Sequence, residues 1–276
     1  MLKLNITFKG CIKTYVIEHG LYKPTKQTKY SIDQIMDVIE YVLITGSSWR
    51  SLNLPIFANT GFRWQSFYYH FKKFSKNHVF GNVYKELISK YFKTNVSGKL
   101  KYLSIDTSFV KNEYASNVAF NGYYKKKRLS KLSLVVDSNG VPLSTVLARG
   151  NINDSKLLDR NIQNMLINIV PKTQNNKHKR YFLADASYDT ANVRQTITSM
   201  NITPMIRHIQ RKRKDMTQNK RFTKKETSIY NRRIIIENCF SWLYKNRRTN
   251  KRYDKSNSTY MSFVYMAFIR ILLRRL

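Results

Sequence analysis

The chain has 276 residues, 42% hydrophobic and 13% aromatic, which is enough for a substantial core and excludes a chain disordered throughout. Fifty Lys and Arg residues against 16 Asp and Glu residues give a formal charge of +34, which predicts a polyanionic partner. The basic residues are spread among Tyr, Phe and Trp, whereas membrane-surface proteins concentrate theirs in one segment. The composition therefore favours nucleic acid over an anionic membrane.

Two cysteines, Cys11 and Cys239, are too few for a disulfide framework and stand in no zinc-binding pattern. The first ten residues hold no signal-like apolar run, and the apolar stretch 261–276 is interrupted by Arg270. We therefore expect no secretion signal, no membrane span and an intracellular protein at DNA, in the cytoplasm or nucleoid, or in the nucleus of a eukaryotic host.

Residues 1–30 are polar and basic and predict an irregular N-terminal arm. From Ser31 the pattern becomes helical, because Gln34 has capping-box spacing and an apolar stripe runs on to Gly46. A short helix or turn follows near Trp49, and two further helices are expected at 62–76 and 82–92.

The third of these helices is basic, with Arg63, Lys72, Lys73 and Lys76. A few short helices with such a face are typical of a helix-turn-helix DNA-binding module, although a helical bundle with a merely solvated basic side fits too. The polar segment 94–99 reads as a linker. We expect a helical DNA-binding domain at 31–98 and a second domain at 99–276.

The second domain alternates strands and helices. Apolar, β-branched strands are expected at 101–110, 131–137 and 141–149, the last two joined by a Ser-Asn-Gly hairpin turn. A helix from Asn153 or Asp154 to Pro171, a strand ending near 185, a helix at 191–200, a strand at 201–209 and a final helical region follow. Three strands, then helix, strand, helix, strand and helix is the order of a ribonuclease-H-like α/β domain.

Two acids close predicted strands, Asp106 in YLSID and Asp185 in YFLAD. In a ribonuclease-H-like sheet these strands are adjacent and parallel, so the two carboxylates would lie side by side and need a cation between them. Mg²⁺ suits this position because it prefers hard oxygen ligands and takes few protein carboxylates.

A third acid, Glu237, lies in the segment YNRRIIIENCFSWLYK. On a helix, Tyr230, Arg233 and Glu237 share one face. The apolar residues Ile236, Phe240 and Leu243 form another stripe that would pack on the sheet. Three carboxylates would complete a site for two metal ions, although Arg233 and Glu237 also have the spacing of a surface ion pair.

Each acid has a structural alternative. Asp106 fits a strand-end turn, and Asp185 fits a cap of the next helix. Among the other acids, we expect Asp189 to cap the helix at 191–200 and Asp137 to belong to the hairpin turn, while Asp154 is a candidate for supporting the site.

These segments resemble the DDE transposases of bacterial insertion sequences, in the group with a Y-x2-R-x3-E signature. Tyr230, Arg233 and Glu237 match that signature, and SIDTSFV and LADASYD resemble the segments of the two aspartates. VVDSNGVPLSTVLARGNINDS, RYDKSNSTYMSFVYMAFI, GSSWRSLNLP and FRWQSFYYHFKKF extend the resemblance over residues 31–276. The signature often continues to a Lys, but Tyr244 holds that position and Lys245 follows one residue later.

The resemblance implies cleavage of double-stranded DNA at transposon ends and transfer of the freed 3′ end to target DNA, by a homodimer on DNA. It implies two Mg²⁺ ions, replaceable by Mn²⁺, held by Asp106, Asp185 and Glu237. Tyr230, Arg233 and Lys245 would contact the DNA near the cut. We expect further phosphate contacts from two basic runs, which are Lys125, Lys126, Lys127 and Arg128, and Arg211, Lys212 and Arg213.

Two alternatives remain open at this point: a domesticated or inactive relative that binds DNA without cutting it, and a ribonuclease-H-like nuclease without transposition. Intact acids at all three positions favour the active transposase. The basic run at 211–214 also fits a nuclear-localisation signal.

Overall fold

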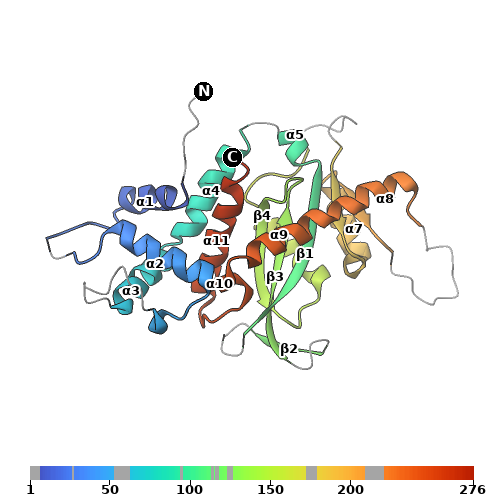
Figure 1. Ribbon diagram of the computed structural model, residues 1–276. Coiled ribbons are helices and arrows are strands. Elements are labelled where there is room, and N and C mark those ends of the chain that lie inside the picture. The colour runs from blue at the N-terminus through green and yellow to red at the C-terminus, as the bar shows by residue number, and fades with distance from the viewer. Residues whose placement is uncertain are drawn as a thin grey trace. The chain divides into compact units, whose positions relative to one another are not determined.

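The computed structural model describes residues 7–26, 28–52, 63–93, 96–112, 115, 118–122, 127–171, 179–208 and 221–276. The chain forms two compact units (Figure 1). The helical unit comprises Met1–Tyr91, Val110–Asn117 and Trp242–Leu276, and the sheet unit comprises Phe92–Phe109 and Val118–Ser241. These units cut across the expected boundary at residue 98, because the C-terminal segment belongs with the N-terminal helices.

The helical unit is built from amphipathic helices around an aromatic core. Its helices are α1 (Phe8–Glu18), α2 (Ile32–Thr45), η1 (Trp49–Ser51), α3 (Trp64–Lys76), α4 (Val79–Tyr91), α10 (Arg247–Asn250) and α11 (Asn257–Leu273). Helix α11 packs against α4 and α3, with Phe263 stacked 4.5 Å from the ring of Phe71. Because α11 is buried along most of its length, it needs this surrounding core.

The predicted capping box of α2 is confirmed. The Ser31 hydroxyl accepts from Gln34 N at 3.2 Å, and the Gln34 side chain accepts from Ser31 N at 2.8 Å. Gly46 ends the helix with a φ of 71°, a left-handed conformation that favours glycine. The expected irregular arm differs, since residues 8–18 form α1, in which Ile12 and Val16 are fully buried. Two apolar residues four apart are a weak helix signal in a basic segment.

The sheet unit carries six strands: β1 (Tyr102–Lys111), β2 (Ala119–Asn121), β3 (Lys127–Val136), β4 (Pro142–Arg149), β5 (Tyr181–Ala184) and β6 (Thr203–Ile206). The strand order is β2-β3-β1-β5-β6, with β4 also paired to β3. The predicted hairpin is confirmed, because β3 and β4 are antiparallel across a turn with Gly140 at φ 78°. Strands β1, β5 and β6 run parallel, which gives the expected ribonuclease-H-like α/β fold.

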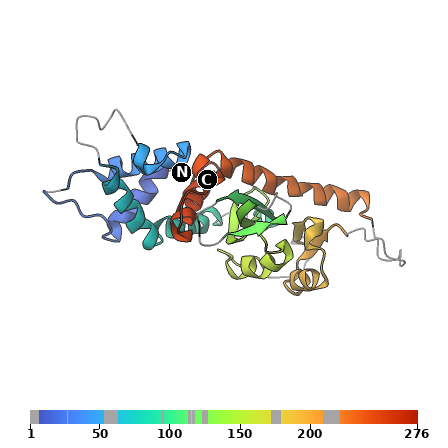
Figure 2. The same ribbon diagram turned by 90° about the horizontal axis from the view of Figure 1, so that it is seen from below.

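The helices of this unit are α5 (Val96–Lys99), η4 (Asp154–Leu157), α6 (Leu158–Gln163), η6 (Ala186–Tyr188), α7 (Ala191–Ser199), α8 (Lys224–Tyr230), η8 (Asn231–Arg233) and most of α9 (Ile234–Tyr244). The last three residues of α9, from Trp242 on, belong to the helical unit. Figure 2 shows α8 and α9 along one face of the sheet and α6 and α7 on the other. A continuous core that includes Leu103, Phe182 and Ile197 joins β1, β5 and α7.

Three expected elements differ in extent. The helix expected to reach Pro171 ends at Gln163, because the β-branched segment after it has low helix propensity and Leu166 N donates instead to Leu143 O at 3.0 Å. Part of the expected linker, Val96–Lys99, is the short helix α5. The final helical region is broken by a 3-10 turn at Asn231–Arg233 before α9 begins.

Candidate active site

Asp106 lies on β1, and Asp185 directly follows the neighbouring parallel strand β5. The register of β1 and β5 pairs Tyr102 with Tyr181 and Ser104 with Leu183, a constant offset of 79 residues (181 − 102 = 79). The same offset brings Asp106 beside Asp185, since 185 − 106 is also 79. Asp106 does not close its strand as expected, because β1 continues to Lys111, whereas β5 ends at Ala184. The two aspartates are therefore neighbours where β5 ends.

The Asp106 carboxylate is partly buried, with a side chain 21% exposed. Its Oδ2 accepts from Arg233 Nη1 at 2.8 Å, and its Oδ1 accepts from Thr107 N at 2.8 Å. Burial raises the pKa of Asp106, and the charge of Asp185 raises it further, against the opposing effects of Thr107 N and Arg233. The position thus disfavours a bare negative charge and favours a nearby cation.

Arg233 joins two of the three predicted acids. Its Nη2 donates to Glu237 Oε1 at 2.8 Å, while its Nη1 holds Asp106. Although burial lowers the pKa of Arg233, the attraction of Asp106 and Glu237 outweighs that effect, so the pKa is raised. The ion pair expected as an alternative is therefore present. The predicted apolar stripe is confirmed, since Ile236, Phe240 and Leu243 are buried.

Asp185 caps the short helix that follows it, as the structural alternative expected. Its Oδ1 accepts from Ser187 N at 2.8 Å and from Ser187 Oγ at 2.5 Å. The expectation for Asp189 was wrong, because Thr190 caps α7 through Val193 N at 3.2 Å. Asp189 accepts instead from Arg194 Nη2 at 2.8 Å. The hydroxyl one residue nearer the helix is the better placed cap.

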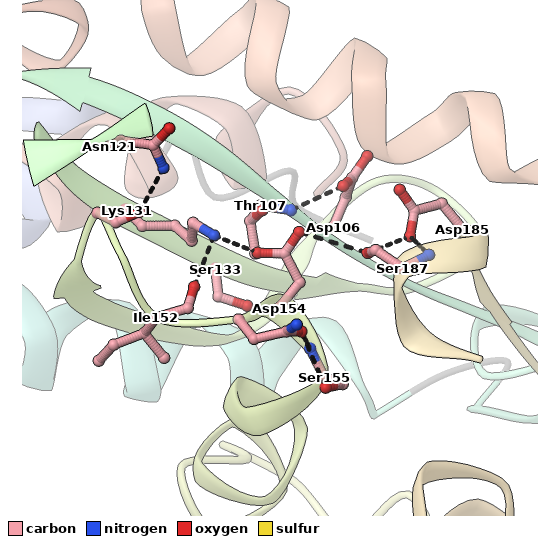
Figure 3. A network of polar contacts seen from close by, with 12 residues as sticks. Asp106, Thr107, Asn121, Lys131, Ser133, Ile152, Asp154, Ser155, Asp185 and Ser187 are labelled. Carbon is pink, nitrogen blue, oxygen red and sulfur yellow. Dashed lines mark hydrogen bonds and ion pairs between the residues drawn. The ribbon is translucent and has the colours of Figure 1, made fainter. Parts of the chain in front are cut away.

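Two further charged residues converge on this region (Figure 3). Lys131 of β3 forms an ion pair with Asp154 of η4, with 2.5 Å between Nζ and Oδ1. Ser187 Oγ lies 3.3 Å from Asp154 Oδ2. Sequence reasoning missed Lys131 and Ser187. The available signal for Lys131 was a lone cation in the apolar strand KLSLVV, where a buried charge requires a partner.

The residues predicted to contact DNA have different surroundings. Tyr230 is only 8% exposed, and its ring packs 4.5 Å from the Arg207 guanidinium. Lys245 follows the end of α9 and is exposed. Lys127 and Arg128 are exposed at the start of β3. The remaining predicted contacts lie outside the described residues; these are Lys125, Lys126, Arg211, Lys212 and Arg213.

The helical unit contains a groove of about 1360 Å³ that sequence reasoning did not anticipate. Residues of η1 and α3 line it together with the segment 248–259. Its cations stand beside aromatic rings, with Arg50 5.9 Å from the ring of Trp64 and Lys72 5.9 Å from that of Tyr68. Trp49 of η1 is 6% exposed and lines the groove.

Among the described residues, no set of three His, Cys, Asp or Glu side chains is gathered closely enough to hold a metal ion. The assignment of Asp106, Asp185 and Glu237 as shared metal ligands therefore stays a prediction. In the same described part of the chain, no helix is sufficiently long and apolar to span a bilayer.

The strand order, with aspartates on neighbouring parallel strands and a glutamate on a covering helix, defines a ribonuclease-H-like domain with an acidic centre. The family described as "Transposase DDE domain" matches residues 98–272, well over half of the chain, and the chain belongs to this family.

A protein of Burkholderia cepacia with the name "Putative transposase for insertion sequence element IS402" is 26% identical to this chain over 141 residues. The match covers 49% of this chain and 58% of that relative's length. Among solved structures, two Mos1 paired-end complexes, one with Mn and one with the left transposon end, are 11% and 12% identical. Each covers 73% of this chain and 68% of the Mos1 chain, with a TM-score of 0.26. A likeness this low carries no argument about the site.

Proposed function

We propose that this protein is a transposase that binds DNA at transposon ends and catalyses metal-dependent strand cleavage followed by strand transfer. One observation carries the proposal. Asp106 of β1 stands beside Asp185, which follows the parallel strand β5, and Arg233 joins Asp106 to Glu237, within a chain of the DDE family.

The donor chemistry of these residues fits divalent cations. Three carboxylates offer the hard oxygen ligands that Mg²⁺ prefers, and partial burial of Asp106 favours positive charge beside its carboxylate. In this proposal Asp106, Asp185 and Glu237 hold two Mg²⁺ ions, which Mn²⁺ can replace. When bound, such ions activate the attacking oxygen and neutralise charge on the scissile phosphate.

The proposed reaction has two steps, hydrolysis of a phosphodiester bond at the transposon end and transesterification at the target. In cleavage, water oxygen bonds to phosphorus at the transposon end, the P–O3′ bond breaks, and the 3′ hydroxyl leaves with a proton. In transfer, that hydroxyl attacks a target phosphate, and the displaced target strand leaves with its own 3′ hydroxyl. Arg233, fixed beside Asp106, brings a guanidinium whose planar donors suit a phosphate.

The charge distribution supports DNA as the partner. The groove of the helical unit combines aromatic rings with exposed cations, including Arg50, Lys72, Lys76 and Lys255. Such cations would contact phosphates without reading the sequence, so binding should weaken steeply as salt rises. We propose that two copies of the chain act together, one at each transposon end.

A cleavage assay tests the proposal. DNA carrying the inverted repeats that flank the coding sequence is incubated with Mg²⁺ and wild-type protein, Glu237→Gln or the matched control Glu86→Gln. Glu86 is an exposed acid of α4 in the helical unit. We expect wild type and the control to cut, and Glu237→Gln to lose at least about 100-fold in cleavage rate while retaining DNA affinity, since a lost ligand removes charge stabilisation.

The outcomes separate the alternatives. Wild-type protein that binds the repeats without cutting them would make this chain a DNA-binding relative. Cleavage without transfer of the 3′ end would indicate a nuclease. Unchanged cleavage by Glu237→Gln would remove Glu237 from the site.

A further inference from the structure

Lys131 is a buried cation inside the sheet. Its side chain is 7% exposed, and Nζ lies 2.5 Å from Asp154 Oδ1 and 2.7 Å from Ile152 O (Figure 3). The ring of Phe109 lies 4.9 Å from the same nitrogen. Removing an ammonium from water costs several kcal/mol, so this geometry requires the Asp154 carboxylate. Lys131 therefore fixes the position of Asp154.

Asp154 in turn reaches Asp185 through one hydroxyl. Ser187 Oγ lies 2.5 Å from Asp185 Oδ1 and 3.3 Å from Asp154 Oδ2. The hydroxyl has a single proton, which a three-centre hydrogen bond shares mainly with the nearer Asp185. A continuous set of contacts thus runs from Lys131 through Asp154 and Ser187 to Asp185, and Figure 3 shows these side chains converging from β3, η4 and η6.

Asp106, Asp154 and Asp185 all act electrostatically on Tyr188, and their binding partners differ. Tyr188, fully buried, has a pKa well above its usual value because of burial and then the charges of Asp154, Asp106 and Asp185. Asp106 forms an ion pair with Arg233, and Asp154 with Lys131. Across the residues that the structure describes, no ion pair includes Asp185, whose hydrogen bonds come from the neutral Ser187. Asp185 is therefore an acid oriented by neutral donors.

We propose that Lys131 and Asp154 are positioning residues for Asp185, acting through the Ser187 hydroxyl. This inference rests on the proposed function, in which Asp185 binds a divalent cation. Hydrogen-bonding partners behind a metal ligand orient it, and their loss typically weakens metal affinity by about 10- to 100-fold. A gain in stability does not by itself explain the Lys131–Asp154 ion pair, because a buried ion pair is often no more stabilising than the apolar residues that could replace it.

The test measures Mn²⁺ binding by calorimetry on the full chain, with thermal denaturation of each variant. Ser187→Ala removes the connecting hydroxyl at an exposed position, and Asp154→Asn and Lys131→Met remove the charges behind it. The exposed neighbours supply matched controls, Asp159→Asn and Lys156→Met. We expect Asp154→Asn and Ser187→Ala each to weaken Mn²⁺ binding about 10-fold or more, with Ser187→Ala leaving the melting temperature unchanged and both controls binding as wild type does.

Two comparisons exclude a merely structural role. Ser187→Thr keeps the hydroxyl and should restore Mn²⁺ affinity. The double variant Asp154→Asn with Ser187→Ala should bind no more weakly than the weaker single variant, because both substitutions interrupt one connection.

Wild-type affinity in both Asp154→Asn and Ser187→Ala would overturn the inference, and so would losses that add in the double variant. If Lys131→Met fails to fold, these two variants still decide the question. Failure of the proposed metal site looks different: wild type binds no Mn²⁺, or Asp185→Asn binds it as well as wild type does. Either of those results refutes the positioning role as well.

Discussion

The Arg248–Asp254 ion pair makes the sharpest stability prediction. Both side chains are 4% exposed, and Arg248 Nη2 lies 3.3 Å from Asp254 Oδ1. Arg248 also donates to Ser47 O at 3.3 Å and faces the rings of Tyr253 and Phe263. At an effective dielectric constant of about 20, charges at this separation attract by about 5 kcal/mol, which offsets the cost of removing both from water.

Replacing Arg248 with Met leaves the Asp254 charge buried without its cation. We expect the free energy of unfolding to fall by about 3–5 kcal/mol at pH 7.5, the usual cost of breaking a buried pair from one side. The double variant Arg248→Met with Asp254→Asn removes both charges and should recover most of this loss. Tryptophan fluorescence during chemical denaturation measures the effect, because all three tryptophans lie in the helical unit.

The loss should also depend on pH. Burial raises the pKa of Asp254, and Arg248 opposes that shift, so the pKa rises further in Arg248→Met. Between the unfolded pKa and this higher folded pKa the folded state binds more protons, and stability therefore falls as pH rises through that window. The deficit of Arg248→Met relative to wild type should be smaller at pH 5 than at pH 7.5. Equal deficits at both pH values would refute the reasoning. So would a double variant whose loss of stability equals the sum of the losses of Arg248→Met and Asp254→Asn measured singly.

Two predictions concern the sheet unit, with amide hydrogen exchange of its strands as the measurement. Phe182→Ala leaves a cavity at a fully buried position in β5 and should lower the free energy of unfolding by about 3–5 kcal/mol. The control Phe120→Ala, at a position 62% exposed, should change that free energy by less than about 0.5 kcal/mol. Similar amide protection in both variants would contradict this prediction. Gly150→Ala would place a Cβ 2.7 Å from Leu129 O and should cost about 1–3 kcal/mol. Gly122→Ala should be tolerated, because among the described residues, its chain neighbours aside, no heavy atom lies within 4 Å of the new Cβ. Equal tolerance of both substitutions would remove the steric argument.

Local signals in the sequence determined much of this protein. The Ser31 capping box, the Ser-Asn-Gly hairpin and the alternation of strands and helices depend on contacts within a few residues, so they could be predicted from the chain alone. The placement of Asp106 beside Asp185 was predicted from the fold class, and the register of β1 and β5 agrees with it. The shared ligand role of these acids and Glu237 stays a prediction.

The tertiary structure decided what distant residues do to one another. The DNA contact expected of Arg233 stays a prediction, but only the fold shows that its guanidinium also binds Asp106, 127 positions away in the chain, and Glu237. Lys131 became visible as a buried partner of Asp154 only once β3 and η4 were packed. The C-terminal helix α11 joined the N-terminal helices because its apolar surface needed a core, and apolar pattern alone does not say which core.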